Sequence, residues 1–192
     1  IFVVKKGQKM KERIVSGMRS TGKLHLGHYL GVIQNWVKLQ HECESFFFVA
    51  DWHALATKYA ETENLRQDVR DVVIDWLASG LDPNVCTIYV QSLVPEIAEL
   101  NVYLGMITPQ NWVERDPCLK DMAKILKTKE GNASQINYGL MGYPVLMSAD
   151  IMMFNATAIP VGVDQVAHIE ITRDIARRFN NIYKTEFFNE PK

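Results

Sequence analysis

Short, mainly apolar segments, of which residues 45–50 form a continuous apolar run, alternate along the chain with longer segments in which apolar residues recur every three or four positions. Runs of this kind are typical of strands buried on both faces of a parallel sheet, whereas the periodic segments are typical of amphipathic helices. The expected strands cover residues 13–18, 45–50, 85–90 and 157–162. Strands that alternate with helices predict an α/β fold, in which a parallel sheet is flanked by helices and the crossovers are right-handed.

The ends of the predicted helices carry recognisable signals. Between residues 24 and 39, the apolar stripe at helical spacing contains Leu26, Leu30, Ile33 and Val37. The next periodic segment ends at Gly80, a residue type that often follows the last helical turn. Pro95 and Pro144 stand where proline opens a helix, and residues 164–180 form the final predicted helix.

Polar residues follow several of the predicted strands directly. In open parallel sheets, ligands bind beyond the carboxyl ends of the strands. This rule nominates four short stretches, residues 16–19, 50–53, 91–92 and 162–165. We therefore expect these stretches to gather around one binding site.

Composition limits the remaining possibilities. The chain has 192 residues, of which 47% are hydrophobic, and its net charge is −1, so we expect one globular domain without overall basic character. The cysteines, Cys43, Cys86 and Cys118, are far apart and odd in number, which argues against a disulfide framework and favours the cytoplasm. No apolar run approaches the roughly 18 residues of a membrane span.

The stretch STGKLHLGHYLG, which begins at Ser20, combines features of an anion site. Ser20 or Thr21 can cap the helix that follows, and a helix start attracts anions through its free N–H groups. Gly27 leaves room for a flat group against the helix. His25 and His28 are one turn apart, and their N–H groups suit phosphate oxygens.

Other interpretations of this stretch remain open. The two histidines can also be residues of an exposed helix face. A metal-binding pair is a third interpretation, although no acidic or cysteine ligand is close in the sequence. A Walker-type phosphate loop is excluded, because the sequence contains no GxxxxGK[ST] pattern.

One carboxylate, Asp150, stands in the strongly apolar segment YPVLMSADIMMF. Burying an ionised carboxylate without a partner costs several kcal/mol. A basic partner or exposure at a helix edge would remove that cost, and so would a hydrogen-bond donor on a bound substrate. Both interpretations are open from these residues alone.

Three long segments resemble one enzyme family. SGMRSTGKLHLGHYLG is similar to the nucleotide-binding signature of class I aminoacyl-tRNA synthetases, whose His-x-Gly-His element coincides with His25 to His28. YPVLMSADIMMFNA and VGVDQVAHIEITRDIARRFN resemble the tryptophanyl branch of that class in its bacterial form. The resemblance extends over residues 12–183 and implies a Rossmann-like nucleotide-binding domain.

The resemblance also implies an activity. The protein would use ATP and Mg²⁺ to convert L-tryptophan to an enzyme-bound adenylate, and would then transfer the acyl group to tRNA(Trp) in the cytoplasm. Catalysis in this family depends on positioning and charge stabilisation, without a covalent nucleophile. Members of the family work as homodimers, and an apolar helix such as residues 96–106 would supply the interface.

Family roles are expected at the matching positions. The residues expected to catalyse are His25, His28 and Thr21. The residues expected to bind ATP are Arg19, Ser20, Thr21, Gly27 and His28, with Gly162, Val163 and Asp164 at the adenine and ribose. The residues expected to bind tryptophan are Asp150 at the indole N–H, Met147, Tyr143 and Gln165 at the ammonium, His53 toward the carboxylate, and Gly17.

The choice of tryptophan has a physical basis. An indole offers one N–H donor and no acceptor, which suits a carboxylate in an apolar pocket. Such a site rejects phenylalanine by about 10⁴- to 10⁵-fold. Tyr143, Met147 and Asp150 have the spacing of a Tyr-x3-Gln-x2-Asp pattern in the tyrosyl branch, with a thioether that packs on a flat ring in place of the amide. A tyrosyl enzyme and a nucleotide-binding module without aminoacylation activity remain the alternatives.

The sequence departs from the family pattern in two respects. Arg19 and Ser20 stand where the bacterial tryptophanyl pattern often has Gln and Pro, so Arg19 adds a cation that can reach a phosphate or a carboxylate. The Lys-Met-Ser-Lys-Ser signature is absent from these 192 residues. We expect residues 1–11 to be an extension that need not be native. We expect residues 12–192 to be a catalytic domain that stops before the signature loop and a helical anticodon-binding domain.

The polar segment over residues 108–135 and a few single polar residues complete the expectations from the sequence. Residues 108–135 are polar and rich in lysine, which predicts an excursion from the core. His53 can also be an ordinary buried histidine, and Asp51 can serve only to cap the helix after it. We expect His168 to be a structural residue of the last helix, and His41 to be exposed.

Overall fold

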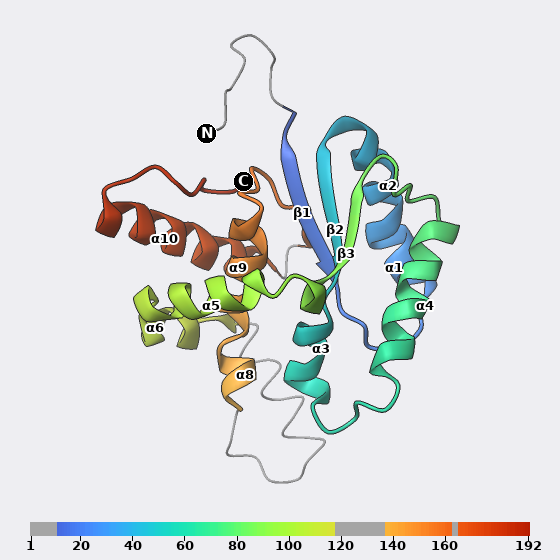
Figure 1. The fold of residues 1–192 in the computed structure, drawn as a ribbon, viewed down its shortest axis with the longest axis horizontal. Helices are drawn as coiled ribbons and strands as arrows, with labels where there is room; N and C mark the ends of the chain where they lie inside the picture. Colours follow the sequence, from blue (N-terminus) through green and yellow to red (C-terminus); the bar gives the residue numbers. More distant parts are fainter. Residues whose placement is uncertain (1–10, 118–136, 163–164) are drawn as a thin grey trace.

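The sheet consists of three parallel strands in the order β1–β2–β3. The computed structural model describes residues 11–117, 137–162 and 165–192. In it, β1 covers Arg13–Met18, β2 covers Glu44–Val49 and β3 covers Thr87–Val90. These strands confirm the first three apolar runs, and they confirm a parallel sheet flanked by helices. Because all three run the same way, their carboxyl ends meet at one edge, beside α3 (Figure 1).

The fourth expected strand, residues 157–162, is wrong as predicted. Within the described residues this segment makes a single parallel bridge, between Ile14 and Ala158. Pro160 has no N–H to continue the ladder. The N–H of Ile159 donates instead to the carbonyl of Lys192 at 3.1 Å. The segment therefore lies against the outer side of β1 without extending the sheet further.

One face of the sheet is covered by α2 and α4 (Figure 1). The helix predicted over residues 24–39 is confirmed as α1 (Leu26–His28), a π-helical turn η1 (Tyr29–Ile33) and α2 (Gln34–Glu42), and α4 spans Leu65–Ala78. Trp36 stacks on Phe47 with ring centroids 4.6 Å apart, and meets Trp76 edge-on at 5.1 Å. Gly80 has a φ of +105°, which explains why glycine ends the α4 segment.

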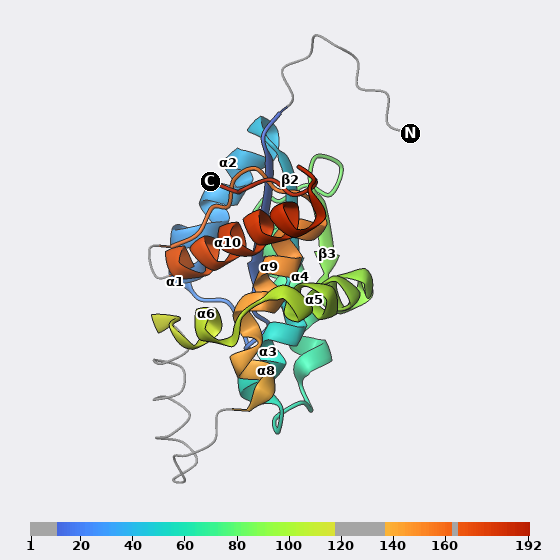
Figure 2. The same cartoon turned by 90° about the vertical axis from the view of Figure 1, so that its left-hand side faces the viewer.

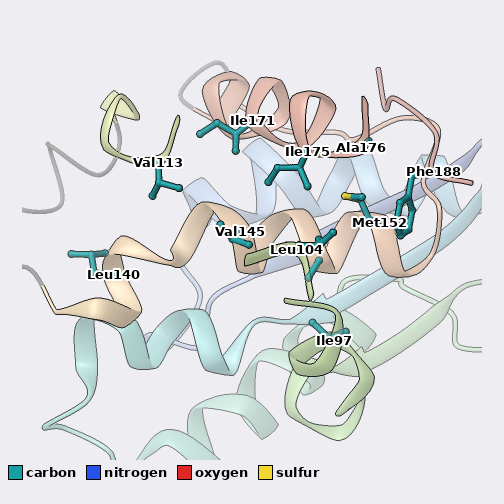
Figure 3. Packing of buried hydrophobic residues seen from close by; sticks show 11 residues of the cluster. Ile97, Leu104, Val113, Leu140, Val145, Met152, Ile171, Ile175, Ala176 and Phe188 are labelled. Carbon is teal, nitrogen blue, oxygen red and sulfur yellow. The ribbon is translucent and has the colours of Figure 1, made fainter. Parts of the chain in front are cut away.

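The opposite face carries α5 (Glu96–Ile107), α6 (Gln110–Glu114), α9 (Tyr143–Met153) and α10 (Val166–Tyr183), as Figure 2 shows from that side. The helix α9 is apolar nearly all round, as a helix packed on several sides must be. Buried residues from these four helices and their connections pack against one another (Figure 3). They include Ile97, Leu104, Val113, Leu140, Val145, Met152, Ile171, Ile175, Ala176 and Phe188.

Shorter elements lie at the carboxyl edge of the sheet. They are α3 (Asp51–Lys58), η2 (Gln91–Leu93) and α8 (Tyr138–Met141). Of the expected excursion over residues 108–135, only residues 108–117 are described, and they contain α6. Cys118 lies outside the described residues. Among the described helices, none is both long enough and apolar enough to cross a bilayer.

Alanine at Gly17 should destabilise the fold. A Cβ added there would lie 2.4 Å from Cζ of Phe48, whose ring is buried between β2 and the cavity described below. Overpacking of a buried site costs about 1–3 kcal/mol. We expect urea unfolding of Gly17→Ala to show a loss of that size. The matched control is Gly31→Ala, because a Cβ at Gly31 meets no atom within 4 Å. Equal unfolding midpoints for both variants would contradict the expectation.

Candidate active site

A cavity of about 490 Å³ opens at the carboxyl edge of the sheet. Its walls come from the end of β1, the start of α3, the inner side of α9 and the start of α10. Three of the four stretches nominated from the strand ends contribute to it. The predicted site residues that line it are Gly17, Arg19, Thr21, His28, His53, Tyr143, Met147, Asp150 and Gln165.

Some predicted site residues lie outside this cavity. The lining does not include His25, Ser20, Gly27 or Gly162. Ser20 is completely buried, whereas His25 and Gly27 are exposed. Val163 and Asp164 lie outside the described residues. The roles expected for these six positions stay predictions.

The start of α1 is capped by a histidine, so the expected cap by Ser20 or Thr21 is wrong. Nδ1 of His25 accepts the N–H of Gly27 at 3.1 Å, and Nδ1 of His28 accepts the N–H of His25 at 3.3 Å. The two rings lie 3.9 Å apart. A Cβ at Gly27 would lie 2.9 Å from the His25 ring, so that ring occupies the space expected for a flat ligand.

This cap decides which nitrogen of a neutral His28 carries the proton. Since Nδ1 accepts a backbone N–H, that proton is on Nε2. His28 lines the cavity, and Nε2–H is the donor that its ring keeps for a ligand. Within the described residues, no group of three His, Cys, Asp or Glu side chains is arranged to hold a metal ion.

Replacing His25 with asparagine should raise the pKa of His28. Burial lowers the pKa of His28 below its usual value, and the charge of the adjacent His25 lowers it further. Asparagine removes only the second cause, because its side chain can still cap the helix. A pH titration of the imidazole resonances by NMR measures this change.

The sign of the effect on stability follows from linkage. The pKa of His28 is lower in the folded chain, so the unfolded chain binds the proton more readily as the pH falls. His28 therefore destabilises the fold below about pH 6.5, the ordinary histidine pKa. A lowered or unchanged His28 pKa in His25→Asn would contradict the assigned cause.

Asp150 has partners within its own fold, which is one of the two interpretations that the sequence left open. The carboxylate is completely buried. Its Oδ2 lies 2.7 Å from Nε2 of His53, and Nε2 of Gln91 donates to Oδ1 and Oδ2 at 2.8 and 2.9 Å. Burial raises the pKa of Asp150, and the hydrogen bonds from His53 and Gln91 oppose that rise.

The carboxylate nevertheless keeps acceptor capacity toward the cavity. An ionised carboxylate has about four lone-pair positions. Oδ2 accepts two of the hydrogen bonds given above and Oδ1 accepts one. Asp150 lines the cavity, so Oδ1 can accept one more N–H from a ligand.

His53 contacts Asp150 through its Nε2. Asp150 is the residue expected at the indole N–H, and the role expected of His53 toward the carboxylate of the substrate stays a prediction. The contact has a local cause: α3 begins directly after β2, and its first turn turns His53 toward α9. The ring also meets Tyr143 edge-on, with centroids 4.3 Å apart. His53 thus remains a wall of the cavity while it supports Asp150.

Gln91 is a site residue to which the sequence assigned no role. Its Oε1 accepts the N–H of Trp52 at 3.1 Å, which turns its amide nitrogen toward Asp150. Asp51 accepts the N–H groups of Trp52 and Ser92, so it links η2 to α3. The N-cap of α3 is Ala50, without a side-chain cap, so the expectation that Asp51 serves only to cap this helix is wrong. The available signal was a glutamine placed directly after a buried strand.

His168 is a further residue at the site for which the sequence predicted only a structural role in the last helix. It is buried, as a structural residue would be, but it also lines the cavity beside Gln165. Its ring lies 5.5 Å from that of Tyr143, between centroids. His41 is exposed, as predicted.

The cavity combines an apolar slot with few polar positions. Its apolar lining consists of Val15, Met18, Val32, Phe48, Ala50, Met147, Ile151, Ile159 and Val161. Asp150 supplies an acceptor deep in this slot, and His28 with Arg19 supplies donors at the β1 end. Such a site suits a flat apolar ring that carries one N–H, joined to an anionic group.

Comparisons with known proteins agree with this chemistry. Residues 7–192 match the family model described as tRNA synthetases class I (W and Y). A tryptophan–tRNA ligase of Ralstonia nicotianae is 53% identical over 175 residues, which cover 91% of this chain and 43% of the relative. One of Thermotoga maritima is 50% identical over 181 residues, covering 94% and 54%. The chain spans about half the length of the curated relatives it matches.

Solved structures give the same picture. A tryptophanyl-tRNA synthetase of Campylobacter jejuni, complexed with ADP and tryptophan, superposes with a TM-score of 0.85 at 37% identity and covers 94% of this chain and 54% of that one. The enzyme of Mycoplasma pneumoniae gives 0.88 at 33%, covering 95% and 52%. A tyrosyl-tRNA synthetase of Archaeoglobus fulgidus matches at 20% identity with a TM-score of 0.73, which shows a shared fold alone.

Proposed function

The chain belongs to the class I tRNA synthetases for tryptophan and tyrosine, and from that premise we propose that it activates L-tryptophan with ATP and transfers it to tRNA(Trp). The observation that carries the choice of amino acid is Asp150, a buried carboxylate that keeps one acceptor position toward an apolar cavity. An indole N–H fills that position. A phenyl ring leaves it empty, at a cost in discrimination of about 10⁴- to 10⁵-fold.

The relatives support tryptophan over tyrosine. Curated proteins named tryptophan–tRNA ligase share 43% to 53% of aligned residues with this chain. The side chain of Met147 lines the cavity one helical turn before Asp150. A thioether packs on a ring face and offers only a weak acceptor, so it provides little for a tyrosine hydroxyl.

The first step of the proposed reaction joins tryptophan to AMP. A carboxylate oxygen of tryptophan attacks the α-phosphorus of ATP, the new C(=O)–O–P bond forms, and the bond from the α-phosphorus to the bridging oxygen breaks. Pyrophosphate leaves with that electron pair. The Nε2–H of His28 and the guanidinium of Arg19 donate to phosphate oxygens as their charge changes. In the second step a ribose hydroxyl of tRNA attacks the acyl carbon, and AMP leaves.

Mg²⁺ fits this proposal as a companion of ATP. Among the residues described, no cluster of acidic, histidine or cysteine side chains could hold the ion by itself. Magnesium commonly keeps several waters and is bound by substrate phosphates with one or two carboxylates at most. When bound there, it would neutralise part of the triphosphate charge.

A homodimer in the cytoplasm is part of the same proposal. The helix α5 exposes Val102, Tyr103 and Met106 by 53%, 58% and 79%. Apolar side chains so close together on one helix are typical of a protein–protein interface. They support the interface that was expected over residues 96–106.

Exchange of labelled pyrophosphate into ATP tests the function directly. In the complete gene product, tryptophan should support exchange and tyrosine should not. Exchange with tyrosine alone would identify a tyrosyl enzyme. Exchange with neither amino acid, while ATP still binds, would identify a nucleotide-binding module without activation chemistry.

A further inference from the structure

Gln91 joins two strand ends to the carboxylate of Asp150. It lies directly after β3 as the first residue of η2, and it is completely buried. Its Oε1 accepts the N–H of Trp52, in the first turn of α3, at 3.1 Å. Its Nε2 donates to Oδ1 and Oδ2 of Asp150 at 2.8 and 2.9 Å. One amide thus connects η2 and α3 to α9, the helix that carries Asp150.

The backbone determines the orientation of this amide. The main-chain N–H of Trp52 can only donate, so the Gln91 atom that faces it is the oxygen. The same N–H also donates to Oδ1 of Asp51 at 3.1 Å, which fixes its direction further. The amide nitrogen therefore faces Asp150, and because this nitrogen only donates, both carboxylate oxygens act as acceptors.

These contacts favour one orientation and one charge state of the carboxylate. Because a single nitrogen contacts both oxygens, rotation of the carboxylate would break at least one hydrogen bond. Burial raises the pKa of Asp150, and the hydrogen bonds from His53 and Gln91 oppose that rise. A carboxylate that is ionised is a stronger acceptor for an N–H donor than a neutral carboxyl group. Gln91 therefore favours the form of Asp150 that an indole N–H needs.

Gln91 is separate from any ligand in the cavity, whereas His53 is not. His53 also contacts Oδ2 of Asp150, but it is itself part of the cavity lining. Gln91 is not among the residues that line the cavity. An effect of Gln91 on a ligand therefore passes through Asp150 or through a general change of the fold, and these two routes can be told apart.

We propose that Gln91 is a positioning residue that holds the Asp150 carboxylate as an acceptor for the ring N–H of the substrate, and so helps to set the preference for indole over rings that lack this group. The inference rests on the proposed function, in which Asp150 accepts the indole N–H. Without the amide, the carboxylate takes up a proton or turns away. Either change weakens the contact with the ring N–H and leaves the contacts with the ring faces in place.

Two ligands that differ at the ring N–H test the inference. They are L-tryptophan and L-benzothienylalanine, in which sulfur replaces the ring N–H and the bicyclic shape is kept. In the complete gene product, calorimetry should show that Gln91→Met binds tryptophan about tenfold more weakly, the size of one hydrogen bond to a charged group. Its affinity for benzothienylalanine should change by less than about twofold, a difference well below that hydrogen bond.

A second buried glutamine provides the matched control. Gln40 donates to the carbonyl of Gly80 at 3.0 Å and accepts the N–H of Asp82 at 2.9 Å, and it does not line the cavity. Gln40→Met should lower the free energy of unfolding and leave both affinities unchanged. In the background of Asp150→Ala, Gln91→Met should cause no further loss of tryptophan affinity, because the effects of coupled residues are not additive.

A milder variant covers the case in which Gln91→Met does not fold. Gln91→Asn keeps a buried amide that is one methylene shorter, so it cannot contact Trp52 and both oxygens of Asp150 together. It should show a smaller loss of the same kind, confined to tryptophan. Urea unfolding of each variant is measured beside the affinities.

Each other outcome overturns the inference. Equal weakening of both ligands in a folded Gln91 variant would identify a structural role, and unchanged affinities would show that Asp150 needs no support from Gln91. Additive losses in the double variant would separate the two residues. If the unmodified protein bound the two ligands equally, the indole assignment of Asp150 would fail as well. If it bound neither, the proposed function itself would fail.

Discussion

Replacing Asp150 with alanine should weaken tryptophan binding about 10- to 150-fold and leave the affinity for ATP unchanged. A hydrogen bond to a charged group contributes about 1.5–3 kcal/mol, which corresponds to that range. Asp150 offers one remaining acceptor position to the cavity, and the surrounding slot is apolar. Calorimetry with tryptophan and with a non-hydrolysable ATP analogue measures both affinities.

A control on the same helix separates binding from folding. Ser148 is also buried in α9, and its hydroxyl contacts Pro144 and Thr172 without lining the cavity. Ser148→Ala should lower the free energy of unfolding and leave tryptophan affinity unchanged. Asp150→Ala also leaves Gln91 and His53 without their acceptor, so its unfolding is measured alongside. Unchanged tryptophan affinity in a folded Asp150→Ala protein would remove the indole assignment.

The strands and helices were predictable because their signals are local. A continuous apolar run marks β2, a short apolar segment that ends in Ser-Gly marks β1, and glycine or proline marks one end of α4 and of α5. Residues 157–162 were predicted as a strand because they are mainly apolar. Pro160 has no N–H for strand pairing, and the segment forms a single bridge to β1. An apolar run indicates that a segment is buried, but pairing with a neighbouring strand also requires backbone N–H groups that can donate hydrogen bonds.

The hydrogen-bond partners of Asp150 could not be predicted from the sequence, for a different reason. His53 and Gln91 lie 97 and 59 positions away in the sequence, on two different strand ends. Their convergence follows from the parallel order of the strands, but which side chain turns toward α9 depends on the first turn of α3 and on the Trp52 N–H that orients Gln91.

For the histidine pair, the sequence indicated the hydrogen-bonding chemistry but not the positions of the two rings. His25 and His28 were expected to act together as donors to phosphate. The structure gives each ring a capping hydrogen bond, and only His28 lines the cavity. Since both Nδ1 atoms accept backbone N–H groups, the capping role and the donor role use different nitrogens and do not compete.

Removal of the His28 imidazole should therefore lower kcat for tryptophan-dependent pyrophosphate exchange by about 10²- to 10³-fold. That is the usual effect of deleting one donor aimed at charge that develops in a transition state. The KM for tryptophan should stay nearly constant in His28→Ala, because the residues proposed to bind the ring, Asp150 and Met147, are other residues of the cavity wall. His28→Gln keeps an N–H donor near the position of Nε2, so it should retain more activity than alanine.

His25→Asn separates the two roles of the other histidine. Asparagine caps helices well, so α1 should persist and the unfolding midpoint should change little. The expected catalytic role of His25 then requires kcat to fall although folding is preserved, because the ring nitrogen Nε2 is lost. Full activity in His25→Asn would confine phosphate stabilisation to His28 and leave His25 as the cap of α1. Equal activity of His28→Ala and the unmodified protein would remove the donor role from the cavity altogether, since Nε2–H is the donor that the His28 ring keeps for a ligand.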